Sequence, residues 1–164
     1  MEDSKQIKAL LFSYFRFKRQ FLGVVSEIQL LKDIDDIDDF IAFKENEIIG
    51  VEIKVSRSDF LADFKNKRKH KKHLTPNSLY PLNKFYFCVP QQLSDFAEDF
   101  LSKHYPFYGL LVVRANEIFV KRSAKRLRDK QDIFSNISLR DKLILRMSSE
   151  LSNLRSEILD KENK

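Results

Sequence analysis

Two opposite charges, Glu52 and Lys54, stand at the end of an apolar strand that the sequence predicts over residues 47–55. Side chains of a strand alternate between its two faces, so Glu52 and Lys54 point the same way while Ile53 points into a core. A carboxylate and an ammonium group therefore share one small site.

Asp39 is expected to join this pair from the preceding strand, which is predicted over residues 37–44. The strands are separated by a glutamate and Asn46, which suits a two-residue hairpin because Asn tolerates a left-handed backbone. This register places Asp39 opposite Glu52, with roughly 5 Å between their Cβ atoms. Two carboxylates so close repel each other unless a cation lies between them. The pair predicts a metal site, and the neighbouring Asp38 is expected to point away from it.

Hard oxygen ligands of this kind favour Mg²⁺ or Mn²⁺, ions that suit the hydrolysis of a phosphodiester. Asp39 and Glu52 would hold the ion, and Lys54 would orient the attacking water or offset developing negative charge. Partial burial of Lys54 is expected to lower its pKa. Glu27, a charge inside the apolar strand predicted over residues 24–31, is a further acidic candidate because such a charge needs a partner. The alternative interpretation is a plain salt bridge between Glu52 and Lys54.

Residues 65–73 place six fixed positive charges in nine positions, at the end of a helix predicted from residue 56 to about residue 73. Neutralising several phosphates releases counterions and gives a sequence-independent, salt-sensitive affinity for DNA. A solvated helix end, favoured by the helix macrodipole, is the alternative. His70 and His73 do not predict zinc, because no cysteine or third histidine joins them. The residues expected to contact DNA are Ser56, Lys65, Lys67, Arg68, Lys69, Lys71 and Lys72, and a second basic run follows at residues 121–130.

Helical and strand periodicities alternate along the rest of the chain. Ser56 and Asp59 have the spacing of a capping box at the start of the second helix. An acidic bend is expected at residues 32–36. Helices are predicted over residues 4–21, 56–73, 92–103 and 138–161, and strands over residues 24–31, 37–44, 47–55, 83–89, 109–114 and 117–121.

The last helix carries apolar residues at alternating three- and four-residue steps, an a/d seam over two heptads. Such a seam predicts either packing against the domain's own surface or pairing with a second copy of the chain. The chain is divided accordingly into a body, residues 1–136, and a C-terminal helical extension, residues 137–164. The seam residues are Ile144, Met147, Leu151, Leu154 and Ile158.

Length and composition indicate one folded domain, because 164 residues with fifteen Phe, three Gly and four Pro can bury a core. The formal net charge of +6 suits a polyanionic partner. No apolar run approaches the length of a membrane span, and the N-terminus is charged from Glu2 onward, so we expect a cytoplasmic protein without a secretory signal. The single Cys88 is expected to be a small buried hydrophobe.

Asp39, followed after twelve residues by Glu52-Ile53-Lys54, resembles the motif of the PD-(D/E)XK nuclease superfamily. Five ordered blocks between about residues 24 and 127 are similar to the MmcB-like DNA-repair group within it. No proline precedes Asp39, and the second helix lacks the Gln and Tyr pair of the RecB-like branch. The blocks are residues 24–27, 39–42, 51–63, 85–90 and 109–111.

The resemblance implies an α/β protein with an αβββαβ restriction-endonuclease-like core and a mixed central sheet. It also implies a divalent-metal site at Asp39, Glu52 and the backbone carbonyl of Ile53, with Lys54 as the catalytic lysine and Glu27 as an accessory acid. DNA would be the substrate. We therefore expect a Mg²⁺- or Mn²⁺-dependent deoxyribonuclease in DNA repair or phage and host DNA processing. The alternative is a DNA-binding protein on the same fold with little or no cleavage activity.

Overall fold

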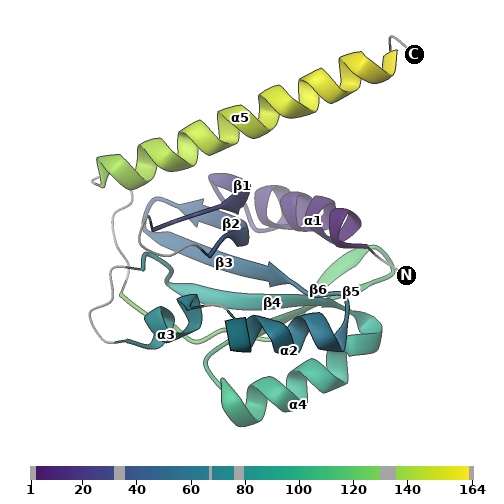
Figure 1. The fold of residues 1–164 in the computed structure, drawn as a ribbon, viewed down its shortest axis with the longest axis vertical. Helices are drawn as coiled ribbons and strands as arrows, with labels where there is room; N and C mark the ends of the chain where they lie inside the picture. The colour runs from purple at the N-terminus through teal and green to yellow at the C-terminus, as the bar shows by residue number, and fades with distance from the viewer. Residues whose placement is uncertain (1–2, 32–35, 67, 76–79, 130–135, 163–164) are drawn as a thin grey trace.

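The computed structural model describes residues 3–31, 36–66, 68–75, 80–129 and 136–162. Within these residues, one six-stranded sheet lies at the centre with helices on both faces (Figure 1). The strands are β1 Gly23–Ile28, β2 Asp38–Lys44, β3 Glu47–Ile53, β4 Lys84–Pro90, β5 Gly109–Arg114 and β6 Glu117–Arg122. The helices are α1 Ser4–Ser13, α2 Arg57–Asn66, α3 Lys69–Leu74, α4 Ser94–His104 and α5 Ile137–Glu162, with a π-helical turn η1 at Tyr14–Lys18 and a 3-10 turn η2 at Gln91–Leu93. The predicted α/β class and order of elements are confirmed.

The strands follow one another in chain order across the sheet, which is mixed as expected. β1, β2 and β3 form an antiparallel meander, β3, β4 and β5 run parallel, and β6 returns antiparallel to β5. The β2–β3 hairpin pairs Lys44 with Glu47, which confirms the predicted two-residue turn. The β5–β6 turn places Ala115 and Asn116 at φ 50° and 59°, the left-handed geometry that such hairpins require. The carboxyl ends of the three parallel strands therefore meet at one edge of the sheet.

Each face of the sheet buries its own apolar cluster. α1 contributes Ile7 and Leu11 to a cluster with Phe40, Val51 and Ile53 on one face. On the other face, α2, α4 and the first half of α5 pack against β-strand residues; their buried contributions are Phe60, Ala97, Leu101, Leu139 and Leu143. Because side chains alternate along β3, Glu52 points to the face covered by α2. Its chain neighbours Val51 and Ile53 point to the face covered by α1.

Two predicted helices are shorter than expected. The first changes at Tyr14 into a π-helical turn, and Gln20 adopts φ 54°, so the helix ends before residue 21. The second begins as predicted, because Ser56 Oγ accepts a hydrogen bond from the Asp59 N–H at 3.2 Å. It ends at Asn66, however, and a separate helix, α3, begins at Lys69. Because α2 ends and α3 begins anew, the basic side chains of α3 point in other directions than they would on one continuous helix.

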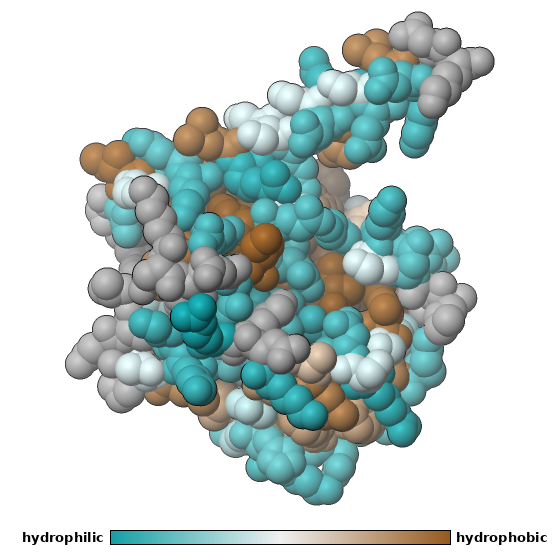
Figure 2. All heavy atoms as spheres, viewed as in Figure 1, coloured by the Kyte–Doolittle hydropathy of each residue, from teal (hydrophilic) through white to brown (hydrophobic). Residues whose placement is uncertain are grey.

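α5 packs on the body only through its first half. Leu139 and Leu143 are buried and Met147 lies against the same cluster, whereas the described residues from Leu151 onward are exposed. The second half projects past the body as an isolated helix with apolar side chains among polar ones (Figures 1 and 2). The first half of the helix thus packs against the domain's own surface through Leu139 and Leu143, whereas only Met147 of the predicted seam takes part and Ile144 is exposed.

Several further expectations concern single features. Cys88 is fully buried in β4, as predicted, and burial raises the pKa of its thiol. Among the described helices, none is long and apolar enough to cross a membrane. Most of the expected acidic bend, residues 32–35, lies outside the described residues, as do residues 130–135, which precede the expected boundary between body and extension.

Candidate functional site

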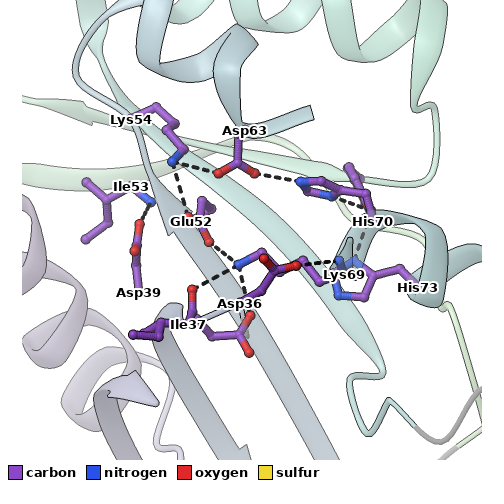
Figure 3. Close-up of polar contacts among 12 residues, drawn as sticks. Asp36, Ile37, Asp39, Glu52, Ile53, Lys54, Asp63, Lys69, His70 and His73 are labelled. Atoms are coloured by element: carbon purple, nitrogen blue, oxygen red, sulfur yellow. Dashed lines mark hydrogen bonds and ion pairs between the residues drawn. The ribbon is translucent and has the colours of Figure 1, made fainter. Parts of the chain in front are cut away.

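Asp39 and Glu52 lie on neighbouring strands in the register that the hairpin predicts. β2 pairs Phe40 with Val51, so the next position along the ladder brings Asp39 opposite Glu52. Asp39 Oδ2 accepts a hydrogen bond from the Ile53 N–H at 2.9 Å (Figure 3). This bond holds the Asp39 carboxylate against the end of β3, beside the residue that separates Glu52 from Lys54.

Lys54 reaches into the same site and stays charged. Its Nζ lies 3.2 Å from Glu52 Oε1, 2.8 Å from Asp63 Oδ1 and 3.7 Å from Asp59 Oδ1. Burial disfavours the charged lysine, but the carboxylates of Glu52 and Asp63 more than compensate, so the pKa of Lys54 is raised. The expected lowering is wrong because these acids outweigh desolvation. Lys54 is a hydrogen-bond donor here and not a base.

A second ammonium group, that of Lys69, lies on the other oxygen of Glu52. Lys69 Nζ is 2.5 Å from Glu52 Oε2 and 3.1 Å from Asp38 Oδ1, and its side chain is fully buried. The prediction that Lys69 contacts DNA is therefore wrong: α3 begins at this residue and turns the side chain into the body. Burial opposes its charge, yet Asp38 and Glu52 raise the pKa of Lys69 overall.

Asp38 also belongs to this site, against the expectation that it points away. Its carboxylate accepts hydrogen bonds from Lys69 Nζ and, at 2.6 Å, from the Tyr80 hydroxyl. Strict alternation holds inside a ladder, but Asp38 is the first residue of β2, where the two donors draw its side chain inward. Burial raises the pKa of Asp38, against the opposing effects of Lys69 and Tyr80.

A chain of buried hydrogen bonds extends the site from Asp63 toward α3. Asp63 Oδ2 lies 2.6 Å from His70 Nε2, and the Tyr108 hydroxyl lies 2.9 Å from Nδ1 of both His70 and His73. Burial lowers the pKa of His73 well below its ordinary value, and the nearby His70 and Lys69 lower it further, so His73 is neutral. The network fixes Asp63 and hence Lys54.

Sequence reasoning missed this network, although a signal for it exists. Asp59 and Asp63 stand four residues apart on α2, so both face Lys54 at the start of that helix. His70 and His73 are three apart within a run of lysines, and they form the buried side of α3. The high net charge of the run favours a solvated or DNA-binding surface, and this charge obscures the helical periodicity of the two histidines.

Glu27 is placed apart from the other acidic candidates. Its carboxylate lies 2.5 Å from Lys8 Nζ and 3.9 Å from the Arg146 guanidinium, and its backbone adopts φ 52°. The hydrogen bond from Lys8 and the charge of that lysine lower the pKa of Glu27. Its side chain is largely exposed and interacts with α1 and α5, so the structure does not bring Glu27 to Glu52 or Lys54.

The donor types at Asp39, Glu52 and the Ile53 carbonyl fit a divalent cation, because all are hard oxygens. Their present partners fit it less well. Each oxygen of Glu52 faces an ammonium group, and within the described residues no cluster of three or more His, Cys, Asp or Glu side chains is arranged to hold a metal. An ion that uses Glu52 must therefore take over at least one of these contacts.

The exposed basic side chains beside the site come from the end of α2 and from α3. Lys65, Arg68, Lys71 and Lys72 are exposed, whereas Ser56 caps α2 and Lys67 lies outside the described residues. The second basic run is partly used inside the fold. Its members Lys121 and Arg122 pair with Asp95 and Glu98 of α4, and Arg128 donates to the carbonyls of Lys72 and His73.

The strand order and the two helical layers define an α/β protein whose core is consistent with the restriction-endonuclease-like fold. No family model and no curated protein matches the chain. Among solved structures, the SPO1766 protein of unknown function from Silicibacter pomeroyi shares 18% sequence identity at a TM-score of 0.63, over 100% of this chain and 96% of that chain. An XisH family protein from Nostoc punctiforme shares 15% identity at a TM-score of 0.44, over 69% of this chain and 94% of that chain. The first likeness shows a shared fold, and neither shows an activity.

Proposed function

We propose that this protein is a Mg²⁺- or Mn²⁺-dependent DNA nuclease of the PD-(D/E)XK type. One observation carries the proposal: the adjoining ends of β2 and β3 hold Asp39, Glu52 and Lys54 together, with Lys54 Nζ 3.2 Å from Glu52 Oε1. Two carboxylates and an ammonium group at one edge of a mixed sheet are the parts that phosphodiester hydrolysis needs. The resemblance of the sequence motif supports the same assignment.

The roles of the residues follow from their positions. A divalent ion bound at Asp39 and Glu52 would polarise a phosphoryl oxygen and lower the pKa of a bound water. The hydrogen bond from Ile53 N–H orients Asp39, while Asp63 and Glu52 orient the Lys54 ammonium. Because the pKa of Lys54 is raised, Lys54 acts by donating hydrogen bonds to the substrate and offsetting its negative charge, and the base must be another group.

The exposed lysines and arginine of α2 and α3 support DNA as the substrate. Lys65, Arg68, Lys71 and Lys72 present exposed positive charges on and between the two helices that carry Asp63 and Lys69. Contacts of such side chains with phosphates carry no sequence information and position the duplex. We propose that this surface holds the DNA backbone while Lys54 faces the scissile phosphate.

A second candidate function is favoured by Lys69. Its ammonium occupies Glu52 Oε2, so the acidic site is neutralised by the chain itself. A DNA-binding protein on this fold with little or no cleavage would have this arrangement and would keep the exposed basic residues. The two functions differ in their dependence on Lys54 and on metal.

The test is cleavage of supercoiled plasmid, nicked, single-stranded and branched DNA with Mg²⁺ or Mn²⁺. A nuclease should lose at least ~100-fold in rate in both Lys54→Ala and Asp39→Asn, because each removes a group that acts in the transition state. Lys103→Ala, on the surface of α4, is the matched control and should cleave like the wild type. Equal products from wild type, Lys54→Ala and Asp39→Asn would indicate a contaminant and favour the DNA-binding alternative.

A further inference from the structure

We infer that Lys69 holds a cation position inside the site and competes with a divalent ion for Glu52. This inference rests on the proposed function, because it concerns how the same acidic site is loaded. It assigns a role to a residue outside the PD-(D/E)XK pattern. Lys69 is a positioning residue in this account, since it acts through Glu52 and touches no substrate.

Three oxygen atoms from two strands and the segment before them converge on the Lys69 ammonium. Glu52 Oε2 lies at 2.5 Å and the Ile37 carbonyl oxygen at 3.4 Å (Figure 3). Asp38 Oδ1 lies at 3.1 Å. Two carboxylates and a carbonyl are the oxygen donors that a hard divalent cation binds. The ammonium therefore occupies a place where a cation is required to keep Asp38 and Glu52 close.

The helix that carries Lys69 is fastened to the body at several points. The Lys69 N–H donates to Asp36 Oδ2 at 2.7 Å, and His70 is bound by Asp63 and Tyr108. At the other end of α3, Arg128 donates to the Lys72 carbonyl at 2.7 Å. The ammonium is thus delivered into the site from a fixed backbone. An ion competes with the side chain alone, not with a loose segment.

The consequence is that Lys69 weakens the binding of a divalent ion at Glu52. An ion that binds Glu52 through Oε2 must displace a buried ammonium, which loses two charged partners as it leaves. If Lys69 becomes an uncharged side chain of similar length, Asp38 and Glu52 are left as adjacent buried carboxylates with a single ammonium group, that of Lys54 on Glu52 Oε1. Such a pair repels unless a cation enters. Removing Lys69 should therefore tighten metal binding.

The experiment is a calorimetric titration of Mn²⁺ into the full chain without DNA. Lys69→Met should bind Mn²⁺ at least ~10-fold more tightly than the wild type, and Lys69→Met with Asp38→Asn should lose that gain because a ligand is removed. Lys103→Met, an exposed lysine on α4, should match the wild type. Equal affinity of Lys69→Met and the wild type would overturn the inference. So would a gain that persists in the double variant, because the ion would then lie elsewhere.

Thermal unfolding keeps the test decisive if Lys69→Met is unstable by itself. A ligand that binds only the folded state raises the unfolding temperature. Mn²⁺ should therefore stabilise Lys69→Met, or restore its circular dichroism spectrum, at concentrations that leave the wild type unchanged. An absence of rescue would overturn the inference. Neither readout involves cleavage, so a wild type that binds DNA without cutting it would defeat the proposed nuclease and leave this result standing.

Discussion

Asp63 binds two cationic or polar partners at once: its Oδ1 lies 2.8 Å from Lys54 Nζ, and its Oδ2 lies 2.6 Å from His70 Nε2. The Asp63 side chain is fully buried, so water cannot replace it as the hydrogen-bond partner of Lys54 or His70. Asp63 thus links Lys54, which follows β3 directly, to the helix that carries Lys69. Asp63 therefore supports both Lys54 and His70, a role that its position in the sequence does not reveal.

Replacing Asp63 should destabilise the fold strongly. Asp63→Ala leaves the Lys54 ammonium buried with less compensation, and breaking a buried pair in this way costs about 3–5 kcal/mol. Asp59→Ala is the matched control, because Asp59 approaches the same ammonium at 3.7 Å but is about half exposed. Its loss should cost under about 1 kcal/mol. Urea unfolding measures both, and equal costs would contradict a special role of Asp63.

The buried neutral His73 should make stability fall in mild acid. Its folded-state pKa is depressed, so below about pH 6.5 the unfolded chain binds a proton that the folded chain excludes. The free energy of unfolding therefore decreases as pH falls, by up to about 1.4 kcal/mol per pH unit for this one group. The raised pKa of Asp38 acts in the opposite direction, because its folded form holds a proton more readily.

The contribution of His73 is isolated by comparing the wild type with His73→Gln between pH 5 and 8. The difference in unfolding free energy between the two should change with pH below about pH 6.5 and stay constant above it. His104→Gln, at the exposed end of α4, serves as the control and should follow the wild-type profile. Parallel profiles for wild type and His73→Gln would contradict a depressed pKa.

The exposed end of α2 and α3 should govern affinity for DNA. Lys65→Ala with Lys71→Ala should weaken binding to all DNA sequences alike, because such contacts are made to phosphates. If each lysine neutralises one phosphate, the slope of log affinity against log salt should fall by about 2. Fluorescence anisotropy at several salt concentrations measures this, with Lys103→Ala as the control. An unchanged slope would remove these lysines from the DNA surface.

The projecting half of α5 is proposed to pair with a second copy of the chain. Leu151, Leu154 and Ile158 are each more than half exposed and keep three- and four-residue spacing. Burying this short stripe between two helices predicts a weak dimer. Leu151→Glu with Leu154→Glu should make sedimentation independent of concentration, whereas Ser149→Glu on the same helix should not. A wild type that is monomeric at all concentrations would contradict the pairing.

The local features that the sequence predicted are those set by alternation and hairpin length. The pairing of Asp39 with Glu52 follows from a two-residue turn, so it needed no knowledge of the rest of the fold. The positions of Asp38 and Lys69 did not follow, because both depend on where α2 ends and α3 begins. That break lies in a run of basic residues, and their charge does not indicate which side chains point into the body and which point to solvent. Tyr80 and Tyr108 come from distant segments, and only the packed structure brings their hydroxyls to the site.

The chain contains one cysteine, and it lies at the centre of the sheet. Because burial disfavours its thiolate and shields it from reagents, Cys88 should not react with maleimides while the protein is folded. Cysteines introduced on the projecting half of α5 can therefore carry spin or fluorescent labels without a cysteine-free background. Distances between two such labels would report directly whether the free helix meets its counterpart on another molecule.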